Sequence, residues 1–145
     1  MFRNILVALD SSPTAQRALR EAADLAEALH ARLTLISVAP EVPSYAYRAG
    51  VDAQRLEREV ETETEKLLRD AVESLPGGLQ VTTLHKHGHA GERIVEQIEA
   101  ANHDLVVMGS RGLGRVTSNL LGSTGAYVHF HARVAMLVIH PDPED

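Results

Sequence analysis

The sequence predicts an α/β domain in which helices cover both faces of a parallel β-sheet. Three observations support this fold class. Strand-sized apolar runs alternate along the chain with segments whose apolar residues recur at helical spacing. The apolar runs are continuous, as expected for strands that are buried on both faces. The chain has 145 residues and no internal repeat, so we expect residues 1–145 to form a single domain.

The first half of the chain supplies two strands and one helix before a loop. The apolar run at residues 5–9 predicts the first strand. Ser12 and Pro13 are typical of a helix start, and apolar residues then recur at helical spacing as far as Leu29. Residues 33–38 predict the second strand, and residues 39–50, with two prolines and a glycine, show no periodicity and predict a loop.

The second half continues the alternation. Apolar residues line one face of a helix over residues 56–75, and Pro76-Gly77-Gly78 ends it. A third strand is predicted over residues 80–86, and a helix around residues 94–101 follows it. Residues 105–108 predict the fourth strand, residues 123–131 a short helix, and residues 135–139 the last strand.

Composition and charge exclude several classes of function. The net charge of −6 and the absence of a basic stripe with aromatic residues argue against nucleic-acid binding. Every apolar run is shorter than the roughly 20 residues that cross a bilayer, so we expect no membrane span. The chain has no cysteine, which is compatible with a reducing cytoplasm.

A glycine-rich segment follows the fourth predicted strand. In doubly wound sheets, ligands bind beyond the carboxyl ends of the strands. Glycines let backbone N–H groups approach an anion closely, and a helix start presents free N–H groups to a phosphate. The segment supplies Gly109, Gly112 and Gly122, then the hydroxyls of Ser123 and Thr124 at a helix start. It has no Gly-Lys-Ser/Thr sequence, so a phosphate bound here would lack the P-loop lysine.

The spacing Gly109-x2-Gly112-x9-Gly122-Ser123 resembles the nucleotide-binding signature of the universal stress protein family, in its ATP-binding branch. The first strand with Asp10, residues 103–112 and the last strand agree with it, so the resemblance covers the whole chain. It implies five parallel strands in the order 3-2-1-4-5 and a cytoplasmic protein. It also implies a homodimer formed through the last strand, Ala135 to Ile139.

The resemblance also implies a role for each site residue. Asp10 would meet the adenosine part of the ligand, and Val38 would pair with the adenine edge through its backbone. Met108 and Gly109 would lie near the ribose and phosphates. The phosphate chain, with Mg²⁺ on it, would be bound by Gly112, Gly122, Ser123 and Thr124.

The resulting hypothesis is an ATP-binding regulatory or stress-response module whose occupancy is sensed by an unidentified protein partner or by the dimer. ATP, ADP, AMP and cyclic nucleotides remain open as ligands, because their phosphates require similar donors. No general base is evident, so we expect hydrolysis to be slow or absent. A slow ATPase or phosphotransferase is one alternative, and a nucleotide-free interaction scaffold is another.

Two other groups of residues are further candidates for a site. His85, His87 and His89 would share one face of an extended strand, as a zinc or copper site requires. No acid with ligand spacing stands beside them, so we expect exposed histidines and no metal centre. Asp10 could also be a metal-binding acid, as in response regulators. These proteins need a second acid near the end of the first strand, and Ser11 and Ser12 stand there, so we set this role aside.

Overall fold

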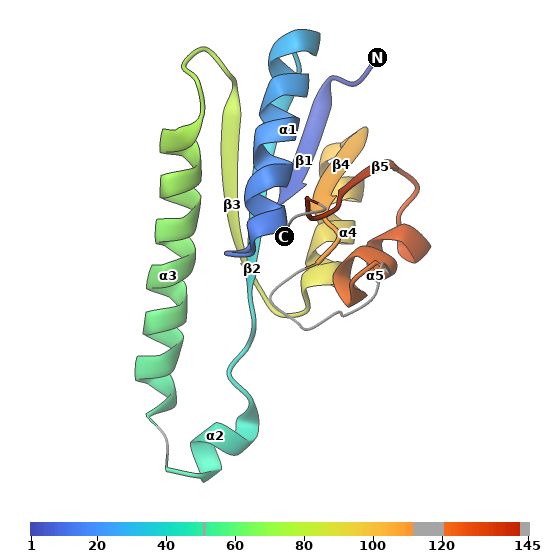
Figure 1. Ribbon diagram of the computed structural model, residues 1–145. Coiled ribbons are helices and arrows are strands. Elements are labelled where there is room, and N and C mark those ends of the chain that lie inside the picture. The colour runs from blue at the N-terminus through green and yellow to red at the C-terminus, as the bar shows by residue number, and fades with distance from the viewer. Residues whose placement is uncertain (51, 112–120, 143–145) are drawn as a thin grey trace.

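The computed structural model describes residues 1–50, 52–111 and 121–142. Its centre is a parallel five-stranded sheet in the order β3-β2-β1-β4-β5, which confirms the predicted architecture (Figure 1). The strands are β1 (Asn4–Ala8), β2 (Arg32–Ala39), β3 (Val81–His87), β4 (Leu105–Gly109) and β5 (Ala135–Ile139). The helices are α1 (Pro13–Leu29), α2 (Ser44–Arg48), α3 (Ala53–Ser74), α4 (Ala90–Ala101) and α5 (Ser123–His131).

Alternating side chains of the central strands build one hydrophobic core on each face of the sheet. Ile5 and Val7 of β1 pack with α1 and α3, whereas Leu6 between them packs with α4 and α5. Because successive side chains of a strand point to opposite faces, a continuous apolar run is what a strand covered on both sides requires. The three inner strands are therefore the most deeply buried part of the described chain.

The region between β2 and α3 differs from the prediction. Residues 39–50 were expected to be a loop, but Ser44–Arg48 form the short helix α2. Five residues are too few to show helical periodicity, and the only buried side chain of α2 is that of Ala46. α3 begins at Ala53, three residues before the predicted start, because the Asp52 side chain accepts a hydrogen bond from Arg55 N. Figure 1 shows α2 and the adjoining end of α3 extending beyond the sheet.

The turn between α4 and β4 is tied to the start of β1. The Asp104 carboxylate accepts hydrogen bonds from the backbone N–H groups of Arg3 (2.8 Å) and Asn4 (3.0 Å).

His103, next to Asp104, is only 6% exposed, and its Nε2 lies 3.1 Å from Nε2 of Gln97. Burial lowers the pKa of His103 below its ordinary value of 6.5, because the charged imidazolium loses water. The neutral ring is therefore the form that the fold stabilises.

The lowered pKa of His103 predicts a pH-dependent stability. Below about pH 6.5 the unfolded chain binds a proton at this histidine more readily than the folded chain does, so acidification favours unfolding. The stability that the neutral His103 ring contributes is fully present above about pH 6.5 and is lost as the pH falls through the folded pKa. We expect the free energy of unfolding, measured by urea titration, to fall less between about pH 7.5 and pH 5.5 in His103→Gln than in the wild type. Equal decreases in the two proteins would show that His103 does not contribute.

Candidate functional site

A cavity of about 270 Å³ lies beyond the carboxyl ends of β1, β2 and β4, where the winding of the sheet reverses. This position is the usual ligand site of doubly wound sheets. Seven of the eight predicted site residues line this one cavity: Asp10, Val38, Met108, Gly109, Gly122, Ser123 and Thr124. The eighth, Gly112, lies outside the described residues. Residues that are more than 100 positions apart in the sequence thus share one site.

Val38 contributes to the polar surface of the cavity through its backbone N–H and C=O groups, since its side chain is apolar. Backbone N–H and C=O groups of alternate residues along a strand point to the same side. The carbonyl of Ile36 accepts a hydrogen bond from Leu9 N at 2.8 Å, so it points toward β1. β1 ends at Ala8, which pairs with Ile36. The N–H and C=O of Val38 therefore extend past the end of β1 and offer one donor and one acceptor beside the cavity.

Asp10 follows β1 and is fixed by the start of α1. Its Oδ1 accepts a hydrogen bond from Ser12 N at 2.8 Å. Ser12 is the N-cap of α1, and its hydroxyl accepts from Ala15 N at 3.3 Å. This contact orients the carboxylate at the edge of the cavity, where it can accept a hydrogen bond from a ligand hydroxyl.

Gly109 allows α1 and β4 to approach each other closely. A Cβ atom at Gly109 would lie 2.8 Å from Cβ of Thr14 and 2.9 Å from its carbonyl carbon. The hydroxyl of Thr14 donates a hydrogen bond at 2.6 Å to the carbonyl of Arg111, just after β4. A larger residue at position 109 would push α1 away from the strand that carries the glycine segment.

The first turn of α5 faces the same cavity. Gly122 is its N-cap and donates a hydrogen bond to the carbonyl of Ser110 at 3.0 Å. Among the described residues, no side chain caps this helix start, so its first N–H groups can face an anion. The hydroxyls of Ser123 and Thr124 lie in the same turn, and Arg111 also lines the cavity and adds positive charge.

Several cavity residues were not predicted as site residues. Ser110 is 2% exposed and lines the cavity, and its Oγ has no hydrogen-bond partner within the described part of the chain. Its place next to Gly109 in the glycine segment is a signal from which the sequence could have identified it. Ala90 and Ile94 of α4 also line the cavity. Nothing local in the sequence indicates that α4 reaches the glycine segment.

The fold and the cavity define a doubly wound α/β domain in which a helix start lines a cavity at the switch point of the sheet. The profile of the universal stress protein family matches residues 1–140. A universal stress protein of Thermus aquaticus is 34% identical to this chain over 139 residues, which cover 96% of this chain and 99% of the relative. This chain belongs to the universal stress protein family.

Solved structures agree with this assignment. The universal stress protein UspA from Lactobacillus plantarum superimposes with a TM-score of 0.81 at 25% identity, covering 95% of this chain and 97% of that one. Two more distant structures share the fold and contain nucleotides. One is a universal stress protein in complex with cAMP (TM-score 0.64, 21% identity, 97% and 99% coverage). The other is a family protein from Arabidopsis thaliana with AMP bound (TM-score 0.73, 17% identity, 98% and 94% coverage).

No described helix is both long and apolar enough to cross a lipid bilayer.

Proposed function

We propose that this chain binds an adenine nucleotide, with ATP as the principal candidate, in the cavity at the carboxyl edge of the sheet. One observation carries the proposal: the start of α5, which no described side chain caps, and the backbone edge of Val38 line the same cavity. The helix start suits phosphates, and the Val38 donor and acceptor suit the edge of a purine base. The AMP and cAMP complexes of the two structural neighbours support this choice of ligand class.

In this proposal each group has a separate role. Asp10 accepts a hydrogen bond from a ribose hydroxyl, and Met108 and Gly109 form the wall beside the ribose and the first phosphate. Gly122, Ser123 and Thr124 bind the phosphate chain, and Gly112, outside the described residues, would extend this contact. The unpartnered Ser110 hydroxyl supplies one further donor. Mg²⁺ would be held mainly by the phosphate oxygens, as is usual for this ion.

Occupancy of the cavity by the nucleotide would act as a signal in the cytoplasm. The absence of cysteine is compatible with that reducing compartment. A phosphate bound at the start of α5 would also affect β5, which follows that helix. An unidentified protein partner would recognise the altered surface. Among the described residues that line the cavity, Asp10 is the only carboxylate, and its Oδ1 already accepts a hydrogen bond from Ser12 N, so the proposal includes no hydrolysis.

The proposal is tested by calorimetric titration of nucleotide-free protein with Mg²⁺ and ATP, ADP, AMP or cAMP in separate experiments. We expect saturable binding of one nucleotide per chain. The order of the four affinities identifies the ligand. If none of the four binds at high micromolar concentration, the proposed function is wrong.

The outer edge of β5 supports a proposed homodimer. β5 pairs only with β4 in the described sheet, so one row of its backbone groups is open to a second strand. Its last four residues are partly exposed and apolar. Light scattering is expected to give twice the mass of one chain, and Val138→Lys, with a charge at this edge, should shift the mass toward that of the monomer. A wild-type mass of one chain would contradict this arrangement.

A further inference from the structure

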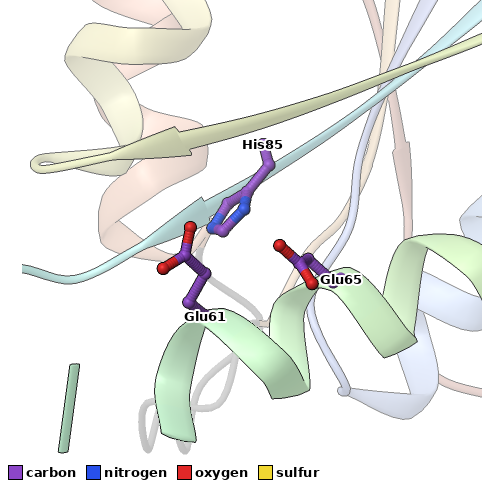
Figure 2. A group of neighbouring side chains, drawn as sticks. All are labelled: Glu61, Glu65 and His85. Atoms are coloured by element: carbon purple, nitrogen blue, oxygen red, sulfur yellow. The ribbon is translucent and has the colours of Figure 1, made fainter. Parts of the chain in front are cut away.

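α3 and β3 bring three metal-ligating side chains together at the edge of the sheet. Glu61 and Glu65 lie one turn apart on α3, and His85 lies on β3. One ligand atom from each, two carboxylate oxygens and an imidazole nitrogen, lie within 4.8 Å of one another. Figure 2 shows the imidazole between the two carboxylates, with a ring nitrogen facing Glu61. None of the three lines the nucleotide cavity.

The fold explains why these three side chains lie on facing surfaces of α3 and β3. Residues four positions apart share one face of a helix, so both carboxylates point in the same direction. Val81 of β3 packs into the core beneath α1 and α3, whereas Leu84 packs on the opposite face of the sheet. By alternation, His85 is on the same face as Val81 and points toward α3. α3 packs along β2 and β3, which places its acidic face over this histidine.

The imidazole of His85 has an unmet polar group. Its Nε2 atom is buried and has no hydrogen-bond partner within residues 1–50, 52–111 and 121–142. Buried polar atoms without a partner are rare in native proteins, and an ion that is absent from the structure is one recognised cause. This observation is independent of the clustering of the two carboxylates.

The two glutamates also lack the ion-pair partners that two other acids of α3, Glu59 and Asp70, have. Glu59 pairs with Arg55 at 3.2 Å, and Asp70 pairs with Lys66 at 3.0 Å. Neither Glu61 nor Glu65 forms an ion pair with any described residue. Like charges four positions apart destabilise a helix, and a cation held between them would relieve this repulsion.

We infer that Glu61, Glu65 and His85 bind one divalent transition-metal ion of the zinc type. An imidazole ligand favours Zn²⁺ or a similar ion over Mg²⁺ and Ca²⁺, which prefer oxygen ligands alone. In tetrahedral geometry, ligand atoms about 2.0–2.2 Å from zinc lie about 3.3–3.6 Å apart, so the exposed carboxylates must rotate toward the imidazole to close the site. The ring of His87, 4.6 Å from that of His85, or a water molecule completes the coordination.

The bound ion would clip α3 to the edge strand β3 without taking part in nucleotide binding. The sequence indicated His85 as a possible metal ligand but not its two acidic partners, because Glu61 and Glu65 precede it by 20 or more positions and belong to another element. His89, the third histidine of the sequence pattern, is not a member of the site. It caps α4, and its Nδ1 accepts a hydrogen bond from Glu92 N at 3.1 Å.

The test is calorimetric titration of chelator-treated, nucleotide-free full-length protein with Zn²⁺ alone. We expect one high-affinity ion per chain. Glu61→Gln and His85→Gln should each weaken binding at least about 100-fold, because loss of a direct ligand exceeds the 10–100-fold effect of losing a supporting residue. Glu63→Gln, on the same helix, and His129→Gln on α5 are matched controls with exposed side chains, and they should bind as the wild type does.

Melting temperatures provide a second readout. Zn²⁺ should raise the melting temperature of the wild type and of both controls but not that of Glu61→Gln. Glu61 is exposed, so its variant should fold normally without metal and decide the question even if His85→Gln is unstable. The site would be overturned if the wild type binds no Zn²⁺, or if Glu61→Gln binds it with wild-type affinity.

Discussion

Gly122→Leu is expected to lower the affinity for Mg²⁺-ATP by about 100-fold or more while the chain stays folded. A Cβ at this position would lie 3.3 Å from the carbonyl oxygen of Ser110, and the rest of a leucine would crowd the cavity that Gly122 lines. Loss of about two charge-assisted hydrogen bonds, each worth about 1.5 kcal/mol, gives the expected factor. The φ angle of −63° at Gly122 is accessible to leucine, so the backbone is not strained.

Gly77→Leu is the matched control for this substitution. It introduces the same side chain at a glycine with no heavy atom within 4 Å of an added Cβ. Calorimetric titration should give wild-type affinity for Gly77→Leu, and circular dichroism should show native structure in both variants. Wild-type affinity in Gly122→Leu would mean that the phosphates bind elsewhere.

Leu35→Ala is expected to lower the free energy of unfolding by about 2–5 kcal/mol. Leu35 lies in β2, is fully buried, and packs into the core shared with α1 and α3. The truncation removes apolar contacts and leaves a cavity that rigid neighbouring strands cannot easily fill. Urea unfolding followed by circular dichroism measures the change directly, since a single domain of this size usually unfolds in one transition.

Leu56→Ala on α3 is the control for the core truncation. Leu56 is 37% exposed, so the same chemical change removes much less buried area. We expect a loss of about 1 kcal/mol or less for this variant. A similar loss in both proteins would contradict the assignment of Leu35 to the rigid core.

Local sequence patterns were sufficient for most of the fold. β1 and β4 were predicted because their apolar runs are continuous, which only doubly covered strands require. The short helix α2 was missed, because its five residues carry no periodic pattern. The early start of α3 was missed because it depends on a hydrogen bond from Arg55 N to the Asp52 side chain. Such a bond forms only when the side chain adopts the capping geometry.

The sequence predicted the part of the candidate site that is local to the chain. The glycine spacing is a property of the chain itself, so Gly109, Gly122 and the hydroxyls that follow were found without the structure. The contact between Thr14 and Gly109 and the buried hydroxyl of Ser110 were not found. They depend on how closely α1 packs against β4.

By itself, the sequence determined the order along the chain of the five strands and the four longer helices, and the place of the glycine segment after β4, because both depend on neighbours along the chain. Only the tertiary structure decided that Val38 presents a free backbone edge to the cavity, since this follows from where β1 ends beside β2. It also decided that Glu61 and Glu65 meet His85. The packing of a helix across a sheet brings together residues from different elements, and no local pattern encodes which of them will touch.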